Sequence, residues 1–115
     1  MSLAGNSSVE RRPVPGYEDH YEITRRGDVY SKRLRRFIRQ RERLHHKLFV
    51  AQAVADAYLS PADRQDILAE VPDLRSLTEA EIESHPVVNK AALEHNVTAV
   101  AVLVVMLRAA ESAAA

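Results

Sequence analysis

The stretch "PVPGYEDHYEITRRGDVYS", Pro13 to Ser31, decides the fold of the amino-terminal part of this chain. Proline fixes φ and keeps its neighbours extended, and Pro15-Gly16 is a turn signal. Tyr21 and Ile23 then alternate with polar residues, as in a half-buried strand. Gly27 supplies a second turn, after which the chain returns as another strand. The stretch therefore predicts a β-hairpin, to which Leu34–Ile38 adds a possible third strand.

Helical patterns fill the rest of the chain. The segment 44–59 has apolar residues on most of its sides, as in a buried helix. Ser60-Pro61 predicts the start of a second helix, and Thr78 with Glu81 forms a capping box for a third. Residues 87–95 and the valine-rich segment from Val97 complete four or five helices, and Asn96 or Thr98 is expected to cap the last. The fold class is therefore α+β, divided into a tail (1–12), a β module with a basic run (13–43) and a helical segment (44–115).

The formal net charge of zero hides an uneven distribution. Residues 1–48 hold twelve Lys/Arg against six Asp/Glu, whereas residues 49–115 hold four against ten. This asymmetry indicates a basic contact surface carried on an acidic body. The chain has no cysteine, which excludes disulfides, thiolate metal sites and cysteine nucleophiles. With no signal peptide and a longest apolar run of nine residues, 99–107, no membrane segment is expected and the cytoplasm is the predicted location.

The basic residues gather directly behind the predicted hairpin. Arginine binds phosphate with two donors at once and also reaches guanine edges, so the run favours nucleic acid. A two-stranded ribbon fits the major groove of duplex DNA, and the hairpin tip is expected to add two arginines to the contact. The alternative is a solvated face that pairs with the acidic half of the chain or with an acidic protein partner. The predicted DNA contacts are Arg25, Arg26, Lys32, Arg33, Arg35, Arg36, Arg39, Arg41 and Arg43.

The opening segment "RRPVPGYEDHYEITRRGDVYSKR" resembles the nuclease-associated modular motif of the NUMOD type, found at the front of phage and intron HNH homing endonucleases. A weaker likeness continues through the 44–59 helix. The resemblance implies a DNA-binding protein of a phage or mobile element, located in the host cytoplasm. The positions that carry it are Pro13, Pro15, Gly16, Tyr17, Glu18, Tyr21, Glu22, Ile23, Gly27, Val29 and Ser31.

The nuclease core that follows this motif in such enzymes is not recognisable after Leu59. His85, Asn89 and His95 spell its H-N-H order, but on an apparently helical segment. A divergent endonuclease that uses them with a divalent metal remains an alternative. Otherwise no cofactor or metal is expected, and no catalytic residue is assigned.

The last apolar element has no polar face. Either other helices of the chain enclose it, or it packs against a second copy of the chain. We expect the second arrangement, which makes the chain a homo-oligomer. A phage structural, assembly or host-interaction protein is the corresponding third class of function. The residues expected at such an interface are Val100, Leu103, Val104 and Leu107.

Overall fold

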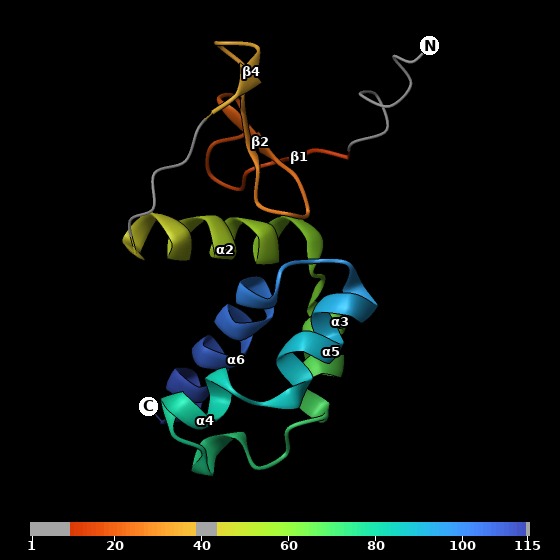
Figure 1. The fold of residues 1–115 in the computed structure, drawn as a ribbon, viewed down its shortest axis with the longest axis vertical. Coiled ribbons are helices and arrows are strands. Elements are labelled where there is room, and N and C mark those ends of the chain that lie inside the picture. The colour runs from red at the N-terminus through yellow and green to blue at the C-terminus, as the bar shows by residue number, and fades with distance from the viewer. Residues whose placement is uncertain (1–9, 39–43, 115) are drawn as a thin grey trace.

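The structure, a computed structural model, describes residues 10–38 and 44–114. A four-stranded antiparallel sheet in the order β1-β2-β3-β4 comes first, and five α-helices follow (Figure 1). The predicted α+β class is confirmed. The strands are β1 (Arg12–Pro13), β2 (Tyr21–Ile23), β3 (Val29–Ser31) and β4 (Arg36–Phe37).

The hairpin between β2 and β3 turns at Gly27, whose φ of 89° lies in the left-handed region that glycine adopts without a steric penalty. The Gly27 amide donates to the Thr24 carbonyl oxygen, and the Thr24 hydroxyl accepts from the Asp28 amide. The expected third strand is present as β4. Arg12 was expected to be the last residue of the tail. It lies instead in β1, where it pairs with Ile23 of β2.

The helix α2 (Leu44–Tyr58) lies between the sheet and the other helices (Figure 1). Its sheet-facing side comes so close to the β2–β3 turn that a Cβ on Gly27 would lie 3.0 Å from Val50 Cγ1. The Tyr58 hydroxyl donates to the Ile23 carbonyl oxygen over 2.7 Å. Val54 and Ala55 are fully buried in the core that these layers share. The helix thus fastens the sheet to the helical body.

The helical body follows the capping signals of the sequence. It contains α3 (Pro61–Ala69), the 3-10 turn η1 (Leu74–Ser76), α4 (Glu79–Glu83), α5 (Pro86–His95) and α6 (Ala99–Ala114). Ser60 and Thr78 form the N-caps of α3 and α4, each within a capping box. Thr98 accepts from the Ala101 amide at the start of α6, so Thr98 rather than Asn96 caps the last helix. Asn96 instead ends α5 in the left-handed conformation, with φ at 53°.

The helix α6 packs against α2, α5, α4, α3 and η1. Val102 and Met106 are fully buried, and Val104 is only 5% exposed. Val104, one of the four residues expected at an oligomer interface, is therefore largely buried within the single chain. Leu103 and Leu107 are partly buried against the same core, and Val100 alone of the four is exposed. Enclosure by the other helices explains why α6 needs no polar face.

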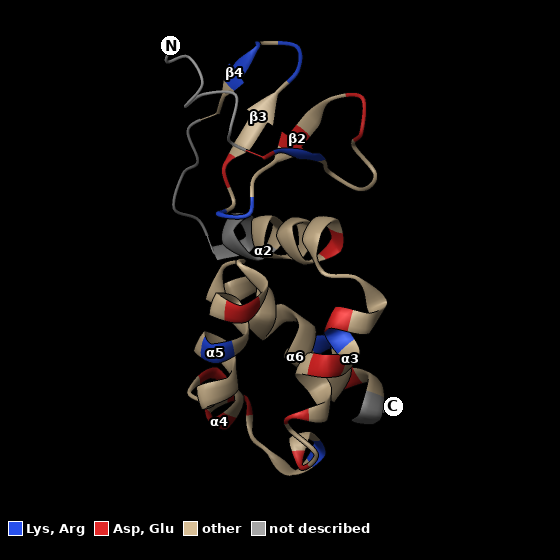
Figure 2. Cartoon of the chain, turned by 90° about the vertical axis from the view of Figure 1, so that its right-hand side faces the viewer, with Lys and Arg blue, Asp and Glu red and all other residues tan. Residues whose placement is uncertain are grey.

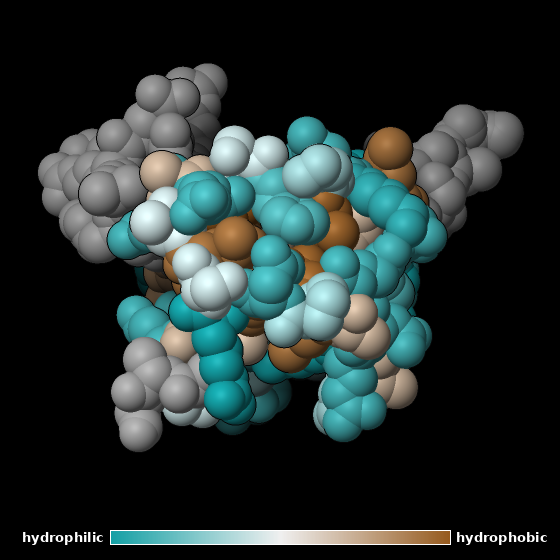
Figure 3. Space-filling view, turned by 90° about the horizontal axis from the view of Figure 1, so that it is seen from below, coloured by the Kyte–Doolittle hydropathy of each residue, from teal (hydrophilic) through white to brown (hydrophobic). Residues whose placement is uncertain are grey.

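The molecule is elongated, with extents of 49 × 27 × 23 Å. The sheet lies at one end of the long axis, and η1 with α4 lies at the other (Figure 1). Seen from this helical end, hydrophilic residues surround apolar ones that reach the surface between them (Figure 3). Among the described residues, no single helix has both the length and the apolar character needed to cross a membrane; α5 and α6 would do so only as a pair, and they meet at a bend of 120°.

Candidate nucleic-acid interface

The turn between β3 and β4, here called the basic turn (Lys32–Arg36), is held by Ser31. The Ser31 hydroxyl accepts from the Leu34 amide over 3.1 Å, and the Ser31 carbonyl oxygen accepts from the Arg35 amide over 2.8 Å. Ser31 is itself 4% exposed, so its two acceptors are fixed in the protein interior. Arg35 takes the left-handed conformation with φ at 55°. The backbone of the turn is thus set by hydrogen bonds that do not depend on its exposed side chains.

Four cationic side chains project from the basic turn, and all four residues are exposed: Lys32, Arg33, Arg35 and Arg36. The Lys32 ammonium donates to the Glu18 carbonyl oxygen over 3.2 Å, which leaves its charge unneutralised. Among residues 10–38 and the described helices, no carboxylate forms an ion pair with the three arginines. The turn therefore presents a concentrated positive charge to solvent.

The acidic residues lie mainly on the helices, away from this turn (Figure 2). The basic turn is at the sheet end of the 49 Å long axis, whereas α4 and its three glutamates are at the opposite end (Figure 1). Exposed charges are largely screened beyond about 8 Å at physiological salt. The charges of the turn are consequently not neutralised by the glutamates of α4.

An aromatic pair lies behind the basic turn, on the sheet face directed away from α2. Glu22, Tyr30 and Phe37 are partners across β2, β3 and β4, so their side chains share one face. Tyr30 and Phe37 meet edge to face at 5.3 Å, and the Arg11 guanidinium lies 3.9 Å from the Tyr30 ring centre. Arg11 also pairs with Glu22 over 3.0 Å. Phe37 and Leu34 are each 42% exposed, so apolar surface adjoins the four cations.

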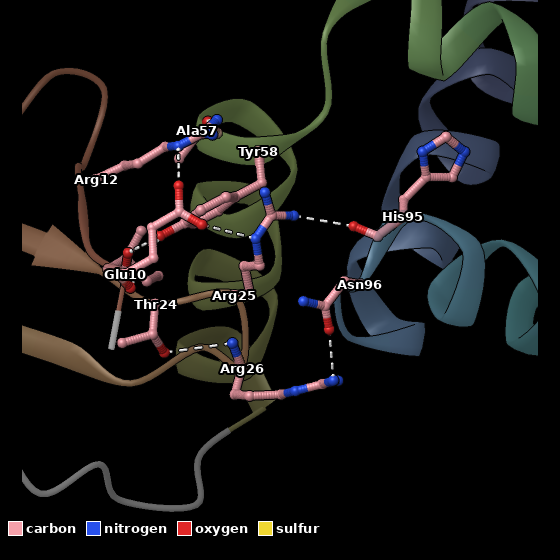
Figure 4. Close-up of polar contacts among 10 residues, drawn as sticks. Glu10, Arg12, Thr24, Arg25, Arg26, Ala57, Tyr58, His95 and Asn96 are labelled. Atoms are coloured by element: carbon pink, nitrogen blue, oxygen red, sulfur yellow. Dashed lines mark hydrogen bonds and ion pairs between the residues drawn. The ribbon is translucent and has the colours of Figure 1, made fainter. Parts of the chain in front are cut away.

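Arg25 and Arg26, the expected DNA contacts at the hairpin tip, form hydrogen bonds with other residues of the same chain (Figure 4). Arg25 donates to Glu10 Oε1 over 2.9 Å and to the His95 carbonyl oxygen over 3.0 Å. Arg26 donates to the Asn96 side-chain oxygen over 2.8 Å. The β2–β3 turn points toward the α5–α6 connection, and each guanidinium has a partner there, while the contact of these two residues with DNA stays a prediction.

Glu10 organises the same junction. Its second carboxylate oxygen accepts from Arg12 over 3.0 Å, and the Arg12 and Arg25 guanidinium carbons each lie 4.6 Å from the Tyr58 ring centre. The hydrogen bond from Arg25 is the main cause that lowers the pKa of Glu10, with Arg12 adding to it. Burial, together with the negative charge of Glu10, raises the pKa of Tyr58. Sequence reasoning missed this cluster, because it placed Glu10 and Arg12 in a loose tail.

A cleft of about 660 Å³ adjoins this junction, lined in part by Arg12, Arg25 and Arg64. Arg64 pairs with Asp56 over 3.0 Å and donates to two carbonyl oxygens at the end of α2 and just after it. The three arginines of the cleft are thus all engaged with groups of the chain. Asp63 also lines it, so the cleft has mixed charge and is a weaker candidate for a polyanion than the basic turn.

The H-N-H residues are not brought together. His85 caps α5, with its Nδ1 accepting from the Val87 amide over 3.1 Å. His95 ends the same ten-residue helix, roughly 15 Å further along the axis. His95 Nδ1 lies 3.7 Å from Asp63 Oδ1, while Asn89 is exposed on α5. Over the described parts of the chain, no three His, Cys, Asp or Glu side chains converge on a metal site.

Three of the expected DNA contacts, Arg39, Arg41 and Arg43, lie outside the described residues. The described basic turn therefore represents four of the nine expected residues, and Arg25 and Arg26 are two further ones that have hydrogen-bond partners within the chain. Comparison of the chain with protein-family models, with curated proteins and with solved structures found no match.

Proposed function

We propose that this protein binds double-stranded DNA through the basic turn (Lys32–Arg36). The observation that carries the proposal is the group of four exposed cations on a backbone that Ser31 holds in place, at the end of the molecule remote from the acidic helices. Arginine and lysine that neutralise phosphates release counterions, which is the main source of sequence-independent DNA affinity. A turn fixed before binding loses little conformational entropy when it binds.

The resemblance of the opening segment to the NUMOD-type motif supports the same reading and suggests an origin in a phage or mobile element. Arg39, Arg41 and Arg43 follow the basic turn in the sequence and extend the contact in this proposal. Arg25 and Arg26 have no direct role in it. They hold the sheet against the helical body and thereby fix the direction in which the basic turn points.

The test is a fluorescence-anisotropy titration of a labelled random-sequence duplex with the wild type and two variants of equal net charge. The first variant carries Arg33→Gln, Arg35→Asn and Arg36→Gln; asparagine is chosen at 35 because it tolerates positive φ. The matched control carries Arg75→Gln, Lys90→Gln and Arg108→Gln on the helical body. We expect the first variant to lose at least tenfold in affinity and the control to stay within about twofold of the wild type, since phosphate contacts dominate affinity.

An equal loss of affinity in the two variants would contradict the proposal, because binding would then depend on overall charge alone. Unchanged affinity in both variants would contradict it too, because neither group of charges would then contribute to binding. The alternative function is binding to an acidic protein partner. The same titration with polyglutamate in place of DNA distinguishes this function from DNA binding. Tighter binding to polyglutamate than to duplex at equal charge would assign the basic turn to an acidic protein partner.

A further inference from the structure

Leu34 is an exposed leucine at the apex of the basic turn. Its exposed fraction is 42%, and Arg33 and Arg35 flank it. Exposed leucines are common singly and need no explanation by themselves. The setting of Leu34 is unusual because four cations surround it within five residues. A partner that offers negative charge and an apolar surface at the same place would match all five side chains of this turn.

The backbone that carries Leu34 is anchored on both sides. The Leu34 amide donates to the buried Ser31 hydroxyl, and the Lys32 amide donates to the His20 carbonyl oxygen over 3.0 Å. After the turn, the Ile38 amide donates to the Val29 carbonyl oxygen over 2.8 Å. The apex thus has a defined shape although its side chains face solvent. A leucine held in this way is suited to entering a narrow site without first ordering a loop.

The aromatic pair supports the base of the turn. Phe37 is paired with Tyr30 across β3 and β4, and their rings meet edge to face. Arg11 lies over Tyr30 on the same face. Phe37 is therefore already packed against Tyr30, whereas Leu34 lies between the cations of the turn. Leu34 is the apolar residue best placed to enter a partner.

We propose that Leu34 acts as an apolar wedge that enters the minor groove of duplex DNA and partly separates two stacked base pairs. The inference rests on the proposed function. Duplex DNA meets both requirements of the turn: phosphates on each side of the groove bind the flanking cations, and the base stack between them is apolar. Leucine is one of the side chains with which minor-groove proteins unstack and kink a base step. The cations hold the turn in place, and the leucine deforms the duplex.

The probe is a 20-base-pair A·T-rich duplex with 2-aminopurine at its centre, because this base fluoresces more strongly when it is unstacked. The proteins are the wild type, Leu34→Ala and, as a matched control, Leu93→Ala; Leu93 is an 83% exposed leucine on α5. We expect the wild type and the Leu93 variant to raise the fluorescence at saturation. Leu34→Ala is expected to give no rise and to bind about tenfold more weakly, the size expected when a leucine side chain is buried on binding. Its salt dependence stays that of the wild type, since no charge is removed.

The outcomes separate the two proposals. Salt-dependent binding by the wild type without a fluorescence rise overturns the wedge and leaves DNA binding standing. Absence of binding at low salt overturns both. A Leu34→Ala variant that matches the wild type in affinity and fluorescence also overturns the wedge. If that variant instead loses self-association in a sizing experiment while DNA binding is unchanged, Leu34 belongs to a protein contact and the wedge is wrong.

Discussion

The Arg25 guanidinium lies 4.6 Å from the centre of the Tyr58 ring and donates from the same group to the carbonyl oxygen of His95. One side chain of the hairpin thus touches both the end of α2 and the end of α5. This contact turns a residue that looks like a DNA contact in the sequence into a structural link between the sheet and the helical body. Within the part of the chain that the structure describes, the basic turn is then the cationic surface that is exposed for a partner.

The Tyr58 hydroxyl is a buried donor whose loss should destabilise the fold. Tyr58→Phe leaves the Ile23 carbonyl oxygen without its 2.7 Å hydrogen bond, and we expect a loss of about 1–2 kcal/mol in the free energy of unfolding. Urea denaturation measures it. Tyr17→Phe is the control, since Tyr17 is 45% exposed and the described residues give its hydroxyl no hydrogen bond. Equal stability of the two variants would contradict the assigned contact.

The same residue gives a prediction at alkaline pH. The pKa of Tyr58 is raised above its usual 10.0, chiefly by burial. The unfolded chain then loses this proton before the folded one, so the stabilisation is complete below pH 10 and is lost as pH rises through the higher folded pKa. We expect the stability of the wild type to fall above pH 10 more steeply than that of Tyr58→Phe.

Glu10 makes the opposite contribution on the acid side. Its pKa is lowered from 4.5, first by the hydrogen bond from Arg25, so its stabilisation is present above pH 4.5 and is lost as pH falls through the folded pKa. Glu10→Gln should therefore lose less stability than the wild type when pH is lowered from 5 to 3. Thermal denaturation across this range tests it, with Glu111→Gln as the control for an exposed glutamate. A parallel decline for the wild type and Glu10→Gln would show that the Arg25 contact does not form.

The two turn glycines separate backbone strain from packing. Gly16 and Gly27 both have φ at 89°, but a Cβ at Gly16 meets nothing within 4 Å, whereas one at Gly27 lies 3.0 Å from Val50. Gly16→Ala should cost about 1–2 kcal/mol from the left-handed backbone alone. Gly27→Ala should cost a further 1–3 kcal/mol or so, because the new methyl group crowds the Val50 side chain of α2. Equal losses in chemical denaturation would mean that the sheet and α2 are less closely packed than described.

Two valines of α6 test whether this helix serves the monomer or an oligomer. Val104 is 5% exposed and Val100 is 44% exposed. We expect Val104→Lys to lower the free energy of unfolding by about 3 kcal/mol or more, since it buries an unpaired charge, and Val100→Lys to change it little. Sizing of the folded Val100 variant completes the test. If the wild type is an oligomer and Val100→Lys dissociates it, the result would support an oligomer interface at the exposed Val100.

The elements that depend on local signals were predictable. Ser60-Pro61 and the capping box of Thr78 with Glu81 are local signals for helix starts, and α3 and α4 begin where they predict. Gly27 likewise marked its hairpin turn, because few other residues adopt its φ without strain. Such signals lie within a few residues of the structure that they specify, so sequence alone reveals them.

The partners of the arginines were not predictable, because they are distant in the sequence. Arg12 donates to the carbonyl oxygen of Ala57, and Arg25 to that of His95, across separations of 45 and 70 residues. A backbone carbonyl also leaves no trace in the sequence, since every residue has one. An arginine that contacts phosphate and one that ties two layers together look the same in a basic run. Exposure and partners in the folded chain distinguish them.

The salt dependence of DNA binding tests the central claim most directly. With a random duplex titrated between 50 and 200 mM salt, contacts by the four cations of the basic turn predict that log affinity falls with log salt at a slope of about −3.6 or steeper. The variant with Arg33, Arg35 and Arg36 neutralised should be flatter by about 2 to 3 units of slope. No binding at low salt, or one slope shared by the wild type and that variant, would contradict a DNA-binding role for the basic turn.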